Sequence, residues 1–156
     1  AWQVCESVWT SKELGIQTFV SAQPLYSMLE RDVEKELLPF CGKYGVGILP
    51  YFPLANGFLT GKYRKDAPPP AGSRLESDNK GLFTDDNYML LEQLIKFSKE
   101  RDRTVLELAF AWLLYNKDIS SVIAGATKPE QVIANSGAAD WLLTDEEYDE
   151  VTGYLS

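Results

Sequence analysis

Three short apolar runs in this sequence each end at residues that could bind a ligand. The runs read IQTFVSA, VGILP and ISSVIA, and the residues that follow them are Gln23, Tyr51 and Gly125. In parallel α/β proteins, ligands bind beyond the carboxyl ends of the strands. If the three runs are parallel strands, a carboxamide, an aromatic ring and a glycine turn therefore meet at one edge of a sheet.

The second of these positions places an aromatic ring beside a turn. Tyr51 is followed by Phe52, Pro53, Leu54 and the pair Asn56 and Gly57. The Asn-Gly pair favours positive φ. A ring can stack on a planar ligand, and the N–H groups of a turn can face a polyphosphate. A hydrophobic plug over the sheet is the alternative interpretation.

A long loop follows this turn, to about residue 83, and it carries Lys62, Arg64, Lys65 and Arg74. It exceeds the roughly 12 to 15 residues that connections usually have, which indicates function or mobility. Three consecutive prolines at 68–70 would stiffen it. A stiffened basic strap suits an anionic ligand, although the same cations can also be solvated loop charges.

The third position contains Gly125, Ala126, Thr127 and Lys128 at the start of a helical pattern. Free N–H groups, the positive end of the helix dipole and a lysine together favour an anion, most simply a phosphate. The alternative is an ordinary capping box, formed by Thr127 and Glu130, beside a solvated lysine. Both interpretations stay open on this segment alone.

The first position is Gln23, which precedes Pro24. The proline biases the backbone of Gln23 to an extended conformation, which holds its amide near the end of the strand. A primary amide can pair reciprocally with another carboxamide. A turn residue that faces water is the alternative.

The hydrophobic pattern predicts helices and strands in alternation. We expect helices over 2–14, 30–45, 84–101, 104–117, 127–139 and 144–155, and strands over 16–23, 46–51 and 119–126. Pro39 could kink the second helix, and Thr-x-x-Glu boxes are expected at 104, 127 and 144. Such an order predicts parallel crossovers, and three apolar strands with two open edges indicate part of a larger α/β sheet or barrel.

Composition excludes several classes of protein. The 156 residues fit one domain, and a net charge of -8 argues against nucleic-acid or acidic-membrane binding. The chain has no histidine, which excludes Ser-His or Cys-His pairs and His-ligated metals within it. Cys5 and Cys41 lack partners at metal-ligand spacing. Without a signal peptide or an apolar run of about 18 residues, we expect a cytoplasmic protein with no metal site.

Taken in order, several segments resemble the C-terminal half of the aldo-keto reductases, in the branch that includes the potassium-channel β subunits. The resemblance covers nearly the whole chain, through WTSKELGI, PLANGFLTGKY and GATKPEQVIAN. It implies a (β/α)8 TIM barrel of which this chain supplies about strands 6–8, with the N-terminal half absent. Residues 1–156 would then be a single partial domain, with a cofactor-strap loop over 52–85.

The resemblance also implies an extended NADP(H) site. Gln23 would bond the nicotinamide carboxamide, and Tyr51 would stack on its ring. The other implied cofactor-binding residues are Phe52, Pro53, Leu54, Asn56, Gly57, Leu59, Lys62, Arg74, Gly125, Ala126, Thr127, Lys128, Gln131 and Asn135. Phe52 stands where the family usually has serine, so a side-chain contact to the pyrophosphate is in doubt. Ala124 replaces a common proline, which we expect to be a mild change.

The family's catalytic Asp, Tyr, Lys and His lie in the other half of the barrel, so no catalytic residue is assigned here. Tyr26 and Tyr63 lack a lysine and an aspartate placed to lower their pKa values, and neither is nominated. The expected function is to bind NADP(H) for the reduction of an aldehyde or ketone. A non-catalytic NADP(H)-sensing regulatory subunit and an inactive truncated fragment are the alternatives. The carbonyl substrate and the oligomeric state are left open by the sequence.

Overall fold

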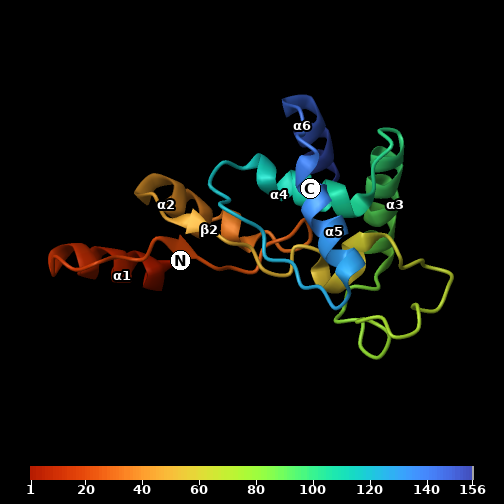
Figure 1. Cartoon of the computed structure of the whole chain (residues 1–156), viewed down its shortest axis with the longest axis horizontal. Helices are drawn as coiled ribbons and strands as arrows, with labels where there is room; N and C mark the ends of the chain where they lie inside the picture. Colours follow the sequence, from red (N-terminus) through yellow and green to blue (C-terminus); the bar gives the residue numbers. More distant parts are fainter. Residues whose placement is uncertain (156) are drawn as a thin grey trace.

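The computed structural model describes residues 1–155. Figure 1 shows an elongated molecule in which α1 extends away from a body of helices, with a short sheet between them. In chain order the elements are α1 (Trp2–Glu13), β1 (Ser21–Ala22), the 3-10 turn η1 (Asp32–Glu34), α2 (Leu37–Tyr44), β2 (Gly47–Ile48), η2 (Ala55–Thr60), α3 (Asp85–Lys99), α4 (Val105–Tyr115), α5 (Pro129–Gly137), η3 (Ala138–Asp140) and α6 (Asp145–Tyr154).

The sheet is parallel, as the alternation of strands and helices predicts. Strand β1 pairs with β2. The third predicted strand lies on the other side of β2, through parallel bridges of Ile48 to Ile119 and of Tyr51 to Ile123. The strands are much shorter than predicted, and the segment 119–126 forms bridges only. Residues 16–20 belong to no strand, although the Val20 carbonyl accepts a hydrogen bond from the Gly47 N–H at 2.9 Å, and Ile16 and Val20 are exposed.

Local sequence signals set most helix ends. Thr104 with Glu107 and Thr144 with Glu147 form complete capping boxes, as predicted. Gly45 ends α2 in the left-handed conformation, with φ 69°, which glycine adopts at no steric cost. These signals act within one turn of a helix, so they can be identified without knowledge of the fold.

Two predicted helix starts are wrong. The expected helix over 30–45 is divided into η1 and α2, because Pro39 lies in the first turn of α2, where no intrahelical N–H bond is required. The expected capping box of Thr127 with Glu130 is absent, since α5 begins one residue later, with Lys128 as N-cap and Pro129 as its first residue. Proline suits that position because its φ is already helical.

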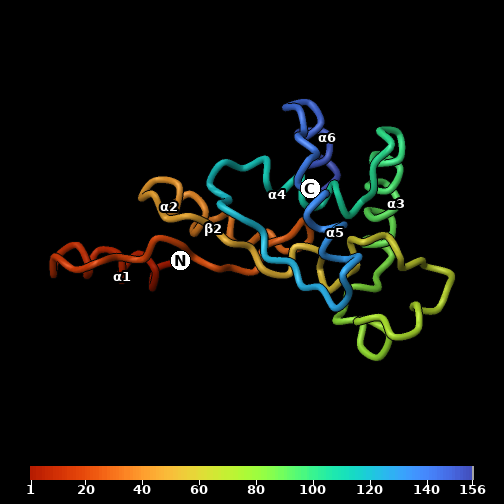
Figure 2. Tube along the Cα trace, in the orientation of Figure 1, coloured from red at the N-terminus to blue at the C-terminus, as the bar shows by residue number. Residues whose placement is uncertain are grey.

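Helix α4 forms the centre of the core. Leu108, Ala109 and Leu113 are fully buried in it, and Trp112 is 1% exposed. Helices α3, α5 and α6 all contact α4, and the tube view shows them gathered around it (Figure 2). The nearly uniform apolar character of residues 105–114 correctly predicted a helix buried on most sides.

Within residues 1–155 no helix has both the length and the apolar character that crossing a membrane requires. The same residues contain no group of three or more acidic or cysteine side chains placed to hold a metal ion.

Candidate functional site

The carboxyl ends of the three strand segments lie side by side. Leu25 forms a parallel bridge to Tyr51, and Tyr51 forms another to Ile123. Gln23 and Gly125 each lie two residues from one of these bridges. The structure thus brings the three predicted positions to one edge, in the order that the sequence implies.

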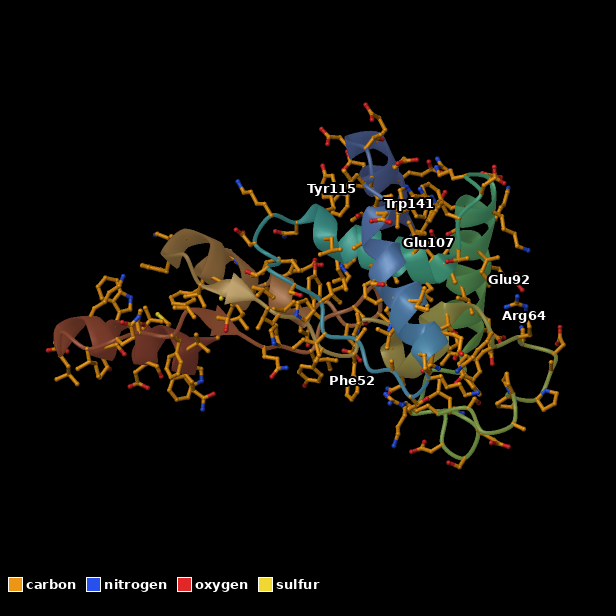
Figure 3. All side chains as sticks on the ribbon, in the orientation of Figure 1. Phe52, Arg64, Glu92, Glu107, Tyr115 and Trp141 are labelled. Atoms are coloured by element: carbon orange, nitrogen blue, oxygen red, sulfur yellow. The ribbon has the colours of Figure 1, made fainter. Side chains whose placement is uncertain are left out.

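An aromatic pair marks the middle of this edge. The Tyr51 and Phe52 rings lie edge to face, with centroids 5.2 Å apart and planes at 64°. Phe52 is 45% exposed, Tyr51 is half-buried and Gln23 is exposed. Figure 3 shows Phe52 at the end of the strands. Tyr51 and Gln23 therefore both have surface in contact with solvent at this edge.

The turn after Tyr51 has an unusual backbone. Asn56 and Gly57 have φ values of 57° and 90°, which confirms the prediction of positive φ for this pair. Phe52 and Ala55 also have positive φ, 56° and 45°. Residues other than glycine, asparagine and aspartate seldom adopt positive φ. Residues that do so cluster at functional sites.

Part of the turn serves the fold itself. The N–H groups of Gly57 and Leu59 donate to the carbonyl oxygen of Leu54, at 2.8 and 3.1 Å. Pro53 is buried, and the Leu59 side chain is fully buried. Two of the residues predicted to bind the cofactor, Pro53 and Leu59, therefore pack in the interior and support the turn.

Three predicted cations are available to an anion. Lys62, Arg74 and Lys128 are exposed, and none forms an ion pair within residues 1–155. A Cβ placed on Gly57 would lie 3.6 Å from the Lys62 ammonium, so this cation stands over the turn. By contrast, Lys65 of the same loop is paired with Asp85 at 3.0 Å.

The long loop is anchored in the core. Tyr63 and Leu75 are each 1% exposed, and the Leu75 N–H donates to the Tyr63 hydroxyl at 3.3 Å. The Tyr63 ring also packs against Phe58 and Phe83. Arg74 therefore directly precedes the buried Leu75, and the basic strap is attached to the core at Leu75 and Tyr63.

The third strand end differs from its prediction in detail. The Thr127 N–H donates to the Gln131 side-chain oxygen at 2.7 Å, and the Thr127 hydroxyl lies 3.2 Å from the same atom. Gln131 therefore organises the start of α5, and Asn135 is half-buried one turn later. An open groove of about 580 Å³ adjoins this start, lined by Ala126, Thr127, Lys128, Pro129, Val132 and Ile133.

The two tyrosines that were not nominated as catalytic are structural. Tyr26 is 2% exposed and donates to Glu34 at 2.8 Å. Burial, followed by this hydrogen bond, raises the pKa of Tyr26 far above its usual value. A phenol with a raised pKa stays protonated at neutral pH. The Tyr26–Glu34 network was not predicted, since no short motif in the sequence signals it.

The groups at this edge can make three kinds of contact with a ligand. Tyr51 offers an aromatic ring. Gln23 offers an amide two residues before Leu25, the residue that is bridged to Tyr51. Lys62, Arg74 and Lys128 supply positive charge without carboxylate partners in residues 1–155. Ring stacking, amide pairing and charge compensation together suit a ligand with a planar ring, a carboxamide and negative charge.

The fold is a parallel α/β arrangement with candidate ligand groups at the carboxyl ends of its strands. The model of the aldo/keto reductase family matches residues 1–155, and the chain belongs to that family. The predicted family membership is thereby confirmed.

Relatives in this family include proteins named as channel subunits and as reductases. The chain is 37% identical to a probable voltage-gated potassium channel subunit beta of Oryza sativa subsp. japonica, over 97% of this chain and 48% of that protein. It is 39% identical to an NADH-specific methylglyoxal reductase of Escherichia coli strain K12, over 79% of this chain and 38% of that protein. It is 33% identical to an L-glyceraldehyde 3-phosphate reductase of the same strain, over 72% of this chain and 34% of that protein. The chain thus spans about half, or less, of the length of the curated relatives it matches.

Proposed function

We propose that this chain is the NADP(H)-binding portion of an aldo-keto reductase that converts an aldehyde or ketone to an alcohol. In this proposal it supplies strands six to eight of a (β/α)8 barrel, and the catalytic residues come from the half that it lacks. The observation that carries the proposal is the double bridge of Tyr51, which lies between the Gln23 and Gly125 segments. Small-molecule carbonyl compounds are the proposed substrates, and the cytoplasm is the proposed compartment.

Each predicted group has a role in this proposal. The Tyr51 ring supports one face of the nicotinamide, and the Gln23 amide pairs with its carboxamide. Lys62 and Arg74 neutralise the pyrophosphate and the 2′-phosphate from the loop, while Lys128 does so from the start of α5. The bound cofactor would supply the hydride. The chain's contribution is to hold the ring in one orientation and to compensate the phosphate charge.

Titration of the full-length protein with NADPH, followed by fluorescence, tests the proposal directly. We expect saturable binding, and we expect Tyr51→Ala to weaken it by about tenfold because the stacking surface is lost. Wild-type protein that shows no saturable binding would refute the proposed function. Leu142→Ala is a suitable control, since Leu142 is 84% exposed and lies outside the predicted site.

The preference for NADP(H) over NAD(H) is a finer proposal, and one relative is named NADH-specific. It rests on Arg74 and Lys128 as phosphate partners. Replacement of both by Ala should raise the KM for NADPH far more than the KM for NADH. Lys65→Ala is the matched control, because Lys65 belongs to the same loop but is paired with Asp85. Equal effects on the two cofactors would contradict the assignment.

A second candidate function is a regulatory subunit that senses NADP(H) without catalysis. The observation in its favour is that several relatives are named as potassium channel β subunits. Both functions predict NADPH binding, so the discriminating measurement is carbonyl-dependent NADPH oxidation. Saturable binding without turnover on a panel of aldehydes and ketones would favour the regulatory function.

An inactive truncated fragment is the remaining alternative, and it concerns the 156-residue chain by itself. Such a fragment would cover its open sheet edges by self-association. Size-exclusion chromatography of the isolated chain would count against it if the chain eluted as a well-behaved monomer.

A further inference from the structure

A partly buried polar network lies beside the strand ends and takes no part in the contacts assigned above. The Tyr26 hydroxyl donates to a Glu34 carboxylate oxygen at 2.8 Å. Arg31 donates to both oxygens of the same carboxylate, at 2.9 and 2.8 Å. A bidentate pair of this kind fixes direction as well as distance. The orientation of the Tyr26 side chain is therefore set by a rigid ion pair.

The backbone of Tyr26 is joined to the candidate site. Its N–H donates to the Tyr51 carbonyl at 3.4 Å, and the Tyr51 N–H donates to the Pro24 carbonyl at 3.0 Å. These two bonds engage both backbone polar groups of Tyr51, its N–H and its carbonyl. Gln23 directly precedes Pro24, so the same segment carries the amide and holds the backbone of Tyr51.

The network is also fixed to the helical core. The Tyr26 and Trp112 rings lie edge to face at 5.6 Å, and the Arg31 guanidinium stands 5.5 Å from the Trp112 ring centroid. Trp112 in turn donates its indole N–H to the Thr152 hydroxyl of α6 at 3.0 Å. The segment that bonds the Tyr51 backbone is thus packed against α4, and α4 is in turn bonded to α6.

We propose that Tyr26 is a positioning residue for the ring end of the site, which it orients through its bonds to Glu34 and to the Tyr51 backbone. This inference rests on the proposed function. The phosphate-end cations Lys62, Arg74 and Lys128 lie on other segments. Loss of the Tyr26 hydroxyl should therefore disturb contacts to the nicotinamide and leave contacts to the phosphates unchanged.

Two probes separate this role from a general loss of stability. NADPH carries the nicotinamide, whereas 2′-phospho-ADP-ribose has the same phosphates and adenosine without it. In full-length Tyr26→Phe protein we expect the Kd for NADPH to rise by about five- to tenfold, the equivalent of one lost hydrogen bond. The Kd for 2′-phospho-ADP-ribose should change by less than about twofold.

A matched control exists in the same chain. The Tyr154 hydroxyl donates to Glu150, which also contacts Arg101, so Tyr154→Phe removes a hydroxyl from a cluster of the same composition. Within residues 1–155 this cluster forms no hydrogen bond or ion pair to the strand ends, and both Kd values should stay at the wild-type level. Glu34→Ala, which removes the acceptor of the Tyr26 hydroxyl, is the second test variant should Tyr26→Phe fail to fold, and it should show the same selective loss.

The outcomes are distinguishable. Equal weakening of both probes in Tyr26→Phe, or no weakening of either, would overturn the positioning role while leaving the proposed function intact. Selective weakening in Tyr154→Phe would also overturn it. Absence of NADPH binding by the wild-type protein would remove the proposed function and this inference with it.

Discussion

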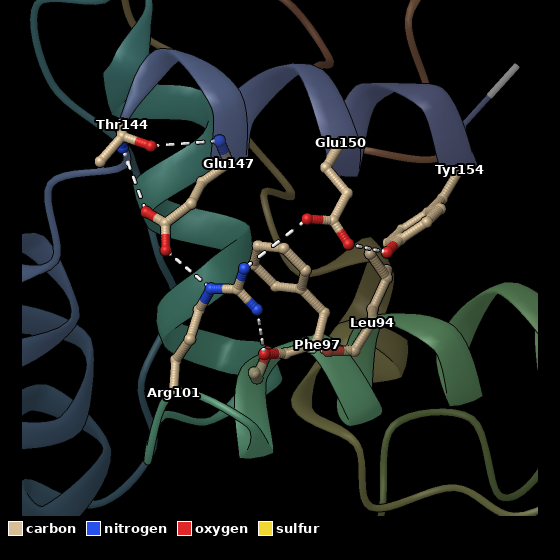
Figure 4. A network of polar contacts seen from close by, with 8 residues as sticks. Leu94, Phe97, Arg101, Thr144, Glu147, Glu150 and Tyr154 are labelled. Atoms are coloured by element: carbon tan, nitrogen blue, oxygen red, sulfur yellow. Dashed lines mark hydrogen bonds and ion pairs between the residues drawn. The ribbon is translucent and has the colours of Figure 1, made fainter.

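Two clusters of tyrosine, glutamate and arginine occupy different parts of this molecule. One joins Tyr26, Glu34 and Arg31 beside the strand ends. The other joins Tyr154 and Arg101 through Glu150 where α3 and α6 meet (Figure 4). The side-chain types are the same, so the difference between the clusters lies in burial and in the number of alternative contacts.

The strand-end cluster depends on one carboxylate. Glu34 accepts from both Tyr26 and Arg31, its side chain is 27% exposed and Tyr26 is 2% exposed. In the outer cluster Arg101 also binds Glu147 at 2.7 Å and stands 3.6 Å from the Phe97 ring centroid. Glu150 is 48% exposed. Loss of one contact is therefore compensated in the outer cluster by neighbours or water, whereas the nearly fully buried Tyr26 has little access to water that could replace Glu34.

The largest expected difference concerns the two carboxylates. Glu34→Ala leaves a buried phenol and a half-buried guanidinium without their acceptor, and it should lower the free energy of unfolding by about 3 kcal/mol. Glu150→Ala removes a largely exposed partner and should cost less than about 1 kcal/mol. Urea unfolding of the full-length variants measures both. Equal losses of unfolding free energy in the two variants would contradict the greater dependence of the strand-end cluster on its carboxylate.

The second largest expected difference is in how Tyr26 and Tyr154 contribute to stability at alkaline pH. Burial raises the pKa of Tyr26, and the hydrogen bond to Glu150 raises the pKa of Tyr154 to about 12. In each case the folded state favours the neutral phenol. This stability is therefore fully present below about pH 10 and is lost as pH rises from there toward the folded pKa, which for Tyr154 is about 12.

The measurement is the slope of unfolding free energy against pH above 9.5 in wild type, Tyr26→Phe and Tyr154→Phe. Each variant should show a shallower fall than the wild type, and Tyr26→Phe the shallowest. Slopes that match the wild type in both variants would contradict the role of burial in the strand-end cluster.

The smallest expected effect concerns the helix start that belongs to the outer cluster. Thr144 caps α6, and its partner Glu147 also binds Arg101. Thr144→Ala should cost about 1 kcal/mol of stability. Thr127→Ala should cost less than about 0.5 kcal/mol, because Thr127 is exposed and is not the N-cap of α5. Thermal unfolding of the two variants measures both costs. A similar cost at both positions would indicate that Thr127 also caps its helix, as the sequence predicted.

Features set by neighbours in sequence were predictable here. The caps at Thr104 and Thr144, the left-handed Gly45 and the positive φ of Asn56 and Gly57 all follow from local chemistry. The alignment of the three strand ends was also predictable, because alternating strands and helices imply parallel order. Family membership followed from motifs that extend over most of the chain.

Features set by distant partners were not predictable. Strand length depends on a ladder partner, so a run such as 16–20 has the sequence pattern of a strand although only its last carbonyl bonds to β2. The burial of Leu75 within a polar loop accompanies its bond to Tyr63, and the Tyr26 side chain that bonds Glu34 packs against Trp112 of α4, which is far away in the sequence. Proline gave an ambiguous signal at Pro39, since a kink and a helix start share the same sequence pattern.

The anchor between Tyr63 and Leu75 has a consequence for how the strap resists cleavage. Because Leu75 is buried and bonded to Tyr63, the long connection behaves as two short exposed loops, over 64–74 and 76–81, rather than as one. Each short loop costs less closure entropy than the whole. A protease that cuts at basic residues should therefore act first at Lys65 or Lys80, at the exposed parts of the two loops, while the bond after Arg74 stays protected beside the buried anchor.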